Sequence, residues 1–185
     1  MPLPLTHALA PVAAVLVRRN QSVPWRLVIA AAIASALPDI DSFSGLIWGT
    51  PDPSLPLPAW WHRGATHSLF AAIAVGLIAA ALHKQLKVSA LAAAVVVGAA
   101  MASHGIFDMF TDQGVAVAYL WPVSSERLFA DWRPIHSSPI GPLHMLTQIV
   151  ARLRSETVQL ILPMFALALF IRGLLALYGK WRGER

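Results

Sequence analysis

The chain has no cysteine among its 185 residues, and charged side chains make up only 12% of it. Without cysteine there are no disulfide bonds and no thiolate ligands, so any bound metal must be held by nitrogen and oxygen atoms. The N-terminal stretch also lacks the basic start and long apolar run of a signal peptide, and we expect the first apolar segment to be retained. Hydrophobic residues instead make up 57% of the chain, and the mean hydropathy of +0.62 favours a membrane protein.

Apolar residues form five segments, at residues 8–17, 27–38, 69–82, 88–103 and 158–178. Only the last is long enough by itself to span the roughly 30 Å hydrocarbon core of a bilayer. The third and fourth segments are rich in alanine and glycine, which let helices approach closely in lipid. The sequence predicts an all-α, polytopic membrane helix bundle of about five helices. We expect one domain over residues 1–185, with its core at 5–135 and a C-terminal transmembrane helix at about 157–178.

Two stretches rich in proline and glycine, residues 42–61 and 113–143, are predicted to be loops. Both are long and unusually apolar for loops. Loops of this length with little regular structure are usually functional, so we expect lids or lipid-facing walls around a site.

Charges are distributed unevenly over the predicted faces. The connections after the first and third segments and the C-terminal end carry nine basic or histidine side chains: Arg18, Arg19, Arg26, His83, Lys84, Lys87, Lys180, Arg182 and Arg185. Eight of the nine acids lie on the other side, between Asp39 and Glu156. By the positive-inside rule the basic connections face the cytoplasm and the acidic face is periplasmic. The formal charge of +5 therefore indicates orientation in a membrane rather than binding of nucleic acid.

Histidine and aspartate residues stand at the same end of the first four segments. They are His7 at the start of the first, Asp39 and Asp41 at the end of the second, His62 and His67 before the third, and His104 and Asp108 after the fourth. If consecutive segments run antiparallel, all seven meet at one membrane face, where ionisable groups are usually functional. Imidazole and carboxylate together form a ligand set for Zn²⁺, Mn²⁺ or Fe²⁺. The sequence therefore predicts a metal site at one face of the membrane.

Two local motifs strengthen this prediction. In residues 62–68, two histidines precede a helix whose N-cap we expect to be Thr66, and Arg63 offers a planar fork suited to phosphate. His104 and Asp108, four residues apart, share one helix face and can bind the same ion. The alternatives are solvated loop histidines in the first motif, and a His–Asp hydrogen bond that closes the bundle in the second.

Further residues on the same side are candidates for catalysis and substrate binding. Asp112 or Asp41 is expected to act as the general base that takes a proton from the water. The alternative for Asp41 is an ordinary turn residue. Arg127 and Arg133 are candidates for binding a phosphate head group, and the alternative is anchoring to anionic lipid. His136, in the long loop, is a candidate for contact with metal or substrate.

The early His7 and the motifs LPDID, HRGATHS and HGIFDMFTDQG, with Leu120-Trp121-Pro122 after them, carry a resemblance that covers roughly residues 5–135. They resemble the bacterial inner-membrane metal-dependent hydrolases, a family that includes a LexA-regulated hydrolase. The resemblance implies a multi-pass enzyme of the inner membrane, distantly similar to zinc-dependent phospholipases C and the single-strand nucleases of the same fold. The metal ligands it implies are His7, Asp39, His62, His67, His104 and Asp108. The N-terminal amine ligand and the further His-x-x-x-Glu of the soluble relatives have no counterpart here, so one or two ions are expected rather than three.

The expected function is hydrolysis of a phosphoester in a membrane lipid, either a phospholipid or an isoprenoid phosphate, by a metal-activated water. A second ion or Arg63 would stabilise charge on the phosphoryl oxygens. Two alternatives remain open: a transporter or channel that passes protons or ions through the His/Asp cluster, and a non-catalytic membrane protein stabilised by metal. The sequence predicts no oligomeric state.

Overall fold

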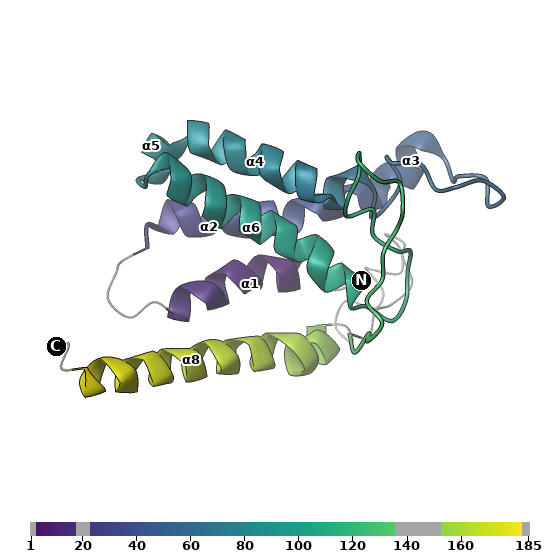
Figure 1. Cartoon of the computed structure of the whole chain (residues 1–185). Helices are drawn as coiled ribbons and strands as arrows, with labels where there is room; N and C mark the ends of the chain where they lie inside the picture. The colour runs from purple at the N-terminus through teal and green to yellow at the C-terminus, as the bar shows by residue number, and fades with distance from the viewer. Residues whose placement is uncertain (1–2, 18–22, 136–152, 183–185) are drawn as a thin grey trace.

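The computed structural model describes residues 3–17, 23–135 and 153–182. Its main helices lie side by side in a bundle (Figure 1): α1 (Pro4–Val17), α2 (Trp25–Ala36), α4 (Leu69–Ala81), α6 (Ala90–Met109) and α8 (Leu162–Trp181). Short elements gather at one end, namely η1 (Leu37–Phe43), α3 (Ser44–Trp48) and η2 (Ala65–His67), while α5 (His83–Leu86) turns the chain at the other. A π-helical turn, η3 (Thr157–Ile161), leads into α8. The predicted all-α bundle is therefore confirmed.

Helices α4 and α6 form the closest pair because small residues face each other between them. A Cβ atom added at Gly76 would lie 2.8 Å from the carbonyl oxygen of Ala94 and 3.3 Å from the Cα atom of Gly98. Helix α2 packs on the other side of α6, where Leu27 and Ala34 join a buried core with Val97. The spacing of the helices that carry the site is thus set by glycine and alanine.

Three helical stretches are long and apolar enough to cross a membrane: Trp25–Trp48, Ala90–Met109 and Leu153–Trp181. Pro4–Val17 and Leu69–Ala81 are shorter apolar helices. The expectation that only the last segment reaches this length was too restrictive. The second segment continues through η1 into α3, and the fourth takes in the polar residues that follow its apolar part.

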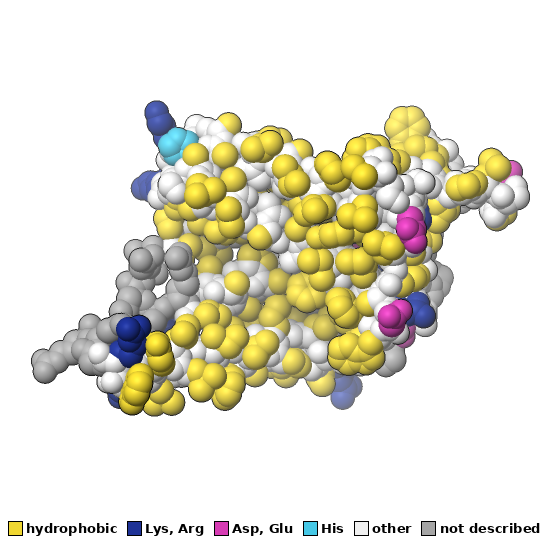
Figure 2. Space-filling model, viewed as in Figure 1, with side chains coloured by type: hydrophobic (Ala, Val, Ile, Leu, Met, Phe, Trp, Pro, Cys, Tyr) yellow, Lys and Arg dark blue, Asp and Glu magenta, His cyan; other side chains and the backbone are white. Residues whose placement is uncertain are grey.

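The outer surface of the bundle is apolar along its middle and charged at its ends. Large hydrophobic side chains such as Leu77, Leu91 and Phe170 are exposed on the helix flanks. Figure 2 shows hydrophobic side chains over the middle of this face, with Lys and Arg at the end that holds α5 and the end of α8, and with Asp and Glu beside some Lys or Arg at the opposite end. This pattern fits a protein whose flanks face lipid.

The two predicted loops are partly corrected by the structure. Residues 42–48 are helical, because the 3₁₀ turn η1 runs directly into α3, and the loop begins only at Gly49, whose φ is +75°. Residues 113–135 are a loop as predicted, pinned by isolated bridges between Thr111 and Ile135 and between Val117 and Leu128. The remainder of the second stretch, 136–143, lies outside the described residues.

The close contact of α4 and α6 generates a prediction for stability. Replacing Gly76 with valine should lower the free energy of unfolding by about 1–3 kcal/mol, because the new side chain must displace the backbone of α6. The matched control is Gly173→Val in α8, since nothing lies within 4 Å of the Cβ position there. Thermal unfolding in detergent measures both; equal losses in the two variants would contradict this account of the packing.

The separation of charges predicts orientation. Single cysteines at Ser54 and Gln85, both exposed and at opposite ends of the bundle, can be introduced without competing native thiols. An impermeant thiol reagent applied to intact cells should label position 54 and leave position 85 unlabelled. Labelling of position 85 alone would reverse the assignment of the two faces.

Candidate metal centre

The seven predicted histidines and aspartates meet at one end of the bundle. They reach it from the first turns of α1, from η1 after α2, from the turn that contains η2, and from the last turns of α6. Each is at most 8% exposed: His7, Asp39, Asp41, His62, His67, His104 and Asp108. The structure therefore brings together the residues that the antiparallel order of segments placed at one depth.

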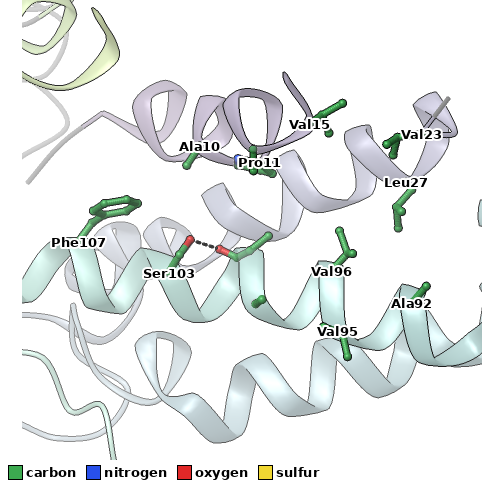
Figure 3. A pocket seen from close by; sticks show the side chains of 13 residues that line it. Ala10, Pro11, Val15, Val23, Leu27, Ala92, Val95, Val96, Ser103 and Phe107 are labelled. Carbon is green, nitrogen blue, oxygen red and sulfur yellow. Dashed lines mark hydrogen bonds between the residues drawn. The ribbon is translucent and has the colours of Figure 1, made fainter. Parts of the chain in front are cut away.

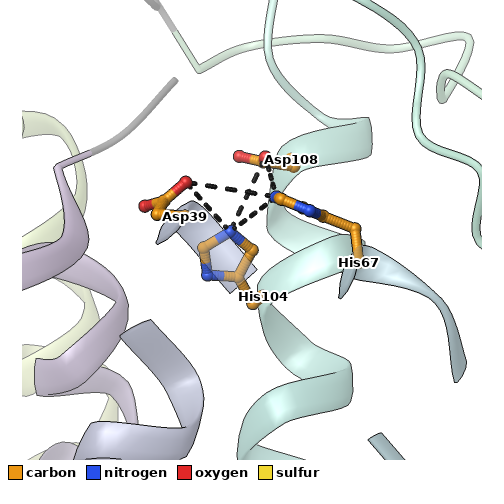
Figure 4. Close-up of side chains that lie close together, drawn as sticks. All are labelled: Asp39, His67, His104 and Asp108. Carbon is orange, nitrogen blue, oxygen red and sulfur yellow. Dashed lines mark hydrogen bonds and ion pairs between the residues drawn. The ribbon is translucent and has the colours of Figure 1, made fainter. Parts of the chain in front are cut away.

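Four of these side chains direct acceptor atoms at a common point (Figure 4), and their ligand atoms all lie within 4.8 Å of one another. His67 Nε2 lies 3.1 Å from His104 Nε2. Asp39 Oδ1 is 3.4 Å from His104 Nε2 and 4.0 Å from His67 Nε2. Asp108 Oδ2 is 3.4 Å from His67 Nε2 and 3.8 Å from His104 Nε2.

The remaining ring nitrogens fix the tautomers of the two histidines. His104 Nδ1 lies 2.7 Å from the carbonyl oxygen of Ser35, which can only accept, so this nitrogen carries the hydrogen. His67 Nδ1 likewise faces a carboxylate oxygen of Asp41 at 3.0 Å. In the neutral rings both Nε2 atoms then present lone pairs toward the two carboxylates. Such a group of buried acceptors repels itself unless a proton or a metal ion lies between its members.

A metal ion fits this arrangement. With bonds of 2.0–2.1 Å, the ligands of a tetrahedral Zn²⁺ lie about 3.3 Å apart, which is within the observed range of separations. Burial alone lowers the pKa of the His67 imidazole, but Asp108 and Asp41 outweigh burial and raise it to about 9. The electrostatic field at this point therefore favours positive charge. The two carboxylates and two imidazoles suit Zn²⁺, Mn²⁺ or Fe²⁺.

Asp41 orients the neighbouring side chains through contacts with both of its carboxylate oxygens. Its Oδ1 lies 2.6 Å from His62 Nδ1, and its Oδ2 accepts hydrogen bonds from the backbone N–H of Arg63 at 3.1 Å and from the Thr66 hydroxyl. Thr66 is therefore not the N-cap of α4; that place belongs to Ser68, whose hydroxyl accepts from the N–H of Ala71 at 3.1 Å. Asp41, His62 and His67 also form a second group of possible ligands.

Arg63 is wholly buried and in direct contact with the cluster. Its Nε lies 2.9 Å from Asp108 Oδ2, and its Nη1 donates to the carbonyl oxygen of Val115 at 2.9 Å. Its Nη2 has no hydrogen-bond partner among the described residues. The backbone of Arg63 has a φ of 59°, and a Cβ atom at Gly64 would lie 2.0 Å from the carbonyl oxygen of Ala59. The tight turn that aims this guanidinium therefore requires Gly64.

His7 covers the cluster from α1. Its ring stacks on that of His104 with centroids 3.7 Å apart, and its Nε2 lies 3.7 Å from Asp108 Oδ1. Helix α1 is seated by Glu156, whose carboxylate accepts from the backbone N–H of Leu3 at 3.0 and 2.8 Å and from the Thr6 hydroxyl. A carboxylate at a helix N-terminus is a favourable placement. The helical stretch that leads into α8 thus fixes the position of His7.

Comparisons with known proteins agree with a membrane setting for this cluster. Residues 1–181 match the model of the YdjM inner membrane protein family. The chain belongs to this family. It is similar to inner membrane protein YbcI of Escherichia coli (strain K12), with 32% identity over 145 residues that cover 76% of this chain and 79% of that protein. No solved structure matches significantly. The chain is thus an inner membrane protein with several membrane-length helices.

Three residues that support the centre of this YdjM-family chain were not predicted from the sequence: Ser35, Gly105 and Glu156. Ser35 accepts from His104 through its carbonyl oxygen, and its hydroxyl donates to the carbonyl oxygen of His7 at 2.9 Å. Gly105 lets α6 approach η2, since a Cβ atom there would lie 2.6 Å from the carbonyl oxygen of His67. In the sequence, only their positions point to two of these residues: Ser35 lies four residues before Asp39, and Gly105 directly follows His104. No feature of the sequence points to Glu156.

Besides Arg63, four predicted residues lie outside the group of seven: Asp112, Arg127, Arg133 and His136. Asp112, half-buried one turn beyond Asp108, donates its backbone N–H to Ile135 at 2.9 Å. Arg127 donates to the carbonyl oxygens of Pro58, His62, Arg63 and Ala116 at 3.0–3.2 Å and so ties two loops together. Arg133 is exposed, with its guanidinium 4.8 Å from the centroid of the Phe129 ring. His136 lies outside the described residues. Nothing in these contacts tests the predicted roles of these four residues, which stay predictions.

The geometry predicts the metal content of the purified protein. The wild type should carry one or two equivalents of Zn, Mn or Fe, and the His67→Ala/Asp108→Ala double variant should carry none. Asp41→Asn should weaken metal affinity at the Asp39, His67, His104 and Asp108 group by roughly 10–100-fold, because it disturbs the orientation of His67 without removing one of these four ligands. Asp52→Asn, on an exposed loop, is the matched control. Elemental analysis decides the matter, and equal metal in the wild type and the double variant would rule the site out.

Proposed function

We propose that the chain is a metal-dependent hydrolase of the inner membrane that cleaves a phosphoester of a lipid. The observation that carries the proposal is the buried convergence of Asp39, His67, His104 and Asp108 on one point, with the Arg63 guanidinium against Asp108. A metal ion at a membrane face beside a buried arginine is a combination suited to phosphoryl chemistry.

In this proposal Asp39, His67, His104 and Asp108 hold the ion. A Zn²⁺, Mn²⁺ or Fe²⁺ ion bound there supplies an activated water near neutral pH. Asp41 keeps the hydrogen of His67 on Nδ1, so that Nε2 stays available as a ligand. His7 and His62 complete the wall of the site, and each has buried ring nitrogen without a hydrogen-bond partner in the described structure.

Arg63 is the proposed contact for the phosphoryl group. Its Nε is taken by Asp108 and its Nη1 by backbone carbonyl oxygens, which leaves the Nη2 amino group for a substrate oxygen. The contact expected from the structure is therefore a single donor rather than the two-pronged one that the sequence suggested. Burial makes such a donor stronger than it would be in water.

Of the two candidate general bases, Asp41 is the one that the structure shows orienting other side chains. Both oxygens of Asp41 already receive hydrogen bonds from His62, His67, Thr66 and the backbone of Arg63, so Asp41 acts as a positioning residue. Asp112 is the other candidate, half-buried on the loop that follows α6 and four residues after Asp108. We assign it the proton of the attacking water.

A lipid is the proposed substrate because the centre lies at one end of apolar helices whose flanks are exposed. Arg133, exposed on the same side, is placed to meet an anionic head group, whereas Arg127 is engaged in holding the loops. Transport of protons or ions remains the alternative function. It would need ionisable groups along a path, and no acidic or histidine side chain lies midway through any apolar segment.

The proposal predicts the effect of Arg63→Lys on hydrolysis. An ammonium cannot reproduce the planar guanidinium that meets both Asp108 and a phosphoryl oxygen, so transition-state stabilisation should fall by roughly 2–4 kcal/mol. Arg26→Lys, at the other end of the bundle, is the matched control. The measurement is release of phosphate or diacylglycerol from a panel of phospholipids and isoprenoid phosphates, with metal content determined on the same preparations.

Two results would count against the proposal. Unchanged hydrolysis in Arg63→Lys at equal metal content would reject the contact with phosphate. Absence of metal-dependent hydrolysis of every lipid in the panel by the wild type would favour the transport alternative.

A further inference from the structure

Two apolar cavities lie along one side of α1 and meet at Phe107. The larger, of about 510 Å³, lies between α1, α2 and α6 (Figure 3) and is lined by residues from Ala10 to Val15 on α1 and from Ala92 to Phe107 on α6. The smaller, of about 300 Å³, lies between the first turns of α1, the end of α6 and the helical stretch of η3 and α8. Phe107 lines both. We call the two cavities together the α1–α6 groove.

The groove exists because α1 packs against α2 and α8 and hardly touches α6. Small side chains widen the gap, among them Ala10 and Ala14 on α1 and Ala92 and Ala99 on α6. From Ala92 to Phe107 it follows α6 for about 22 Å at 1.5 Å per residue. That length exceeds the depth of one leaflet, about half of the 30 Å hydrocarbon core.

The lining of the groove changes from apolar in the larger cavity to more polar in the smaller one. Among the residues that the structure describes, no charged side chain lines either cavity. The larger cavity is apolar apart from Ser103, whose hydroxyl donates to the carbonyl oxygen of Ala100 at 2.8 Å. The smaller holds the other polar lining residues, Thr6, His7 and Gln159. The groove therefore has an apolar body and a polar end.

The polar end borders the candidate metal centre through His7, the one residue of the cluster that lines the smaller cavity. His7 lines the smaller cavity, stacks on the ligand candidate His104 and points Nε2 toward Asp108 at 3.7 Å. Both nitrogens of His7 are buried without a hydrogen-bond partner in the described structure. A molecule with an apolar tail and a polar head would thus place its tail against the apolar walls of the groove and its head beside the cluster.

We propose that the α1–α6 groove holds one alkyl chain of a membrane lipid whose polar head lies at the metal centre. This deepens the proposed function and rests on it for the identity of the head group. Because the chain moves from bilayer to groove without crossing water, the groove gains little from the hydrophobic effect. What it provides is placement, since a seated tail brings the head group to the ligands.

The test uses a phosphatidylglycerol with a photoreactive diazirine on one acyl chain, in vesicles of phosphatidylethanolamine and phosphatidylglycerol that contain the full chain. Adducts are mapped by mass spectrometry. In the wild type they should concentrate on groove residues such as Ala99, Ser103 and Phe107. Filling the groove with Ala14→Trp or Met164→Trp should remove most of them. Leu169→Trp is the matched control, since Leu169 is exposed on α8 and lines neither cavity.

Metal content and thermal unfolding of each variant show whether its fold is intact. If one filling variant does not fold, the other still tests the inference. Adducts spread evenly over the outer flanks and unaffected by either filling variant would overturn the inference. So would disulfide-linked dimers formed by single cysteines placed at Ala99 or Ser103, because these would make the groove a helix interface.

Hydrolysis measured on the same samples separates this inference from the proposed function. If the wild type hydrolyses lipid phosphoesters and neither filling variant changes adducts or turnover, the groove inference fails and the hydrolase proposal stands. If adducts concentrate in the groove and disappear on filling, but no lipid is hydrolysed, the groove binds a lipid tail and the hydrolase proposal fails.

Discussion

The mutual repulsion of buried acceptor atoms is the constraint on which the rest of this structure depends. The Nε2 atoms of His67 and His104 lie 3.1 Å apart, and the carboxylates of Asp108 and Asp39 lie beside them. Ser35 and Asp41 hold the opposite ring nitrogens and so prevent either imidazole from turning away. A proton on His67, the Arg63 guanidinium or a metal ion at the centre offsets this repulsion, and the end of the bundle keeps these groups in place.

The fold serves this centre through close contacts and fixed turns. Gly105 and Gly64 permit backbone approaches that any side chain would block, and these approaches set the positions of His67 and Arg63. Arg127 binds the two loops beside the centre to each other through backbone carbonyl oxygens. Glu156 fixes the first turn of α1 and with it His7. The α1–α6 groove then follows from the same arrangement, because a helix held by α2 and α8 leaves its third side open toward α6.

Much of the site was predictable from the sequence, because the order of antiparallel helices determines at which face of the membrane each helix begins and ends. Antiparallel segments put the end of one beside the start of the next, so His67 and Asp108 had to lie at one level. Finer roles were not predictable. Asp39 and Asp41 are two residues apart, yet one faces the cluster and the other orients histidines, and the 3₁₀ path of η1 decides which. The continuation of α2 to Trp48, Ser68 rather than Thr66 as N-cap and the capping of α1 by Glu156 also depend on tertiary contacts that no periodicity records.

X-ray absorption at the zinc edge, on protein purified in detergent and loaded with Zn²⁺, tests the central claim most directly. The account predicts only nitrogen and oxygen neighbours at about 2.0–2.1 Å, with the outer-shell scattering of two imidazole rings. That scattering should be lost in the His67→Ala/His104→Ala variant. A spectrum without imidazole scattering, or one left unchanged by this variant, would contradict the account, because the ion would then lie elsewhere in the chain.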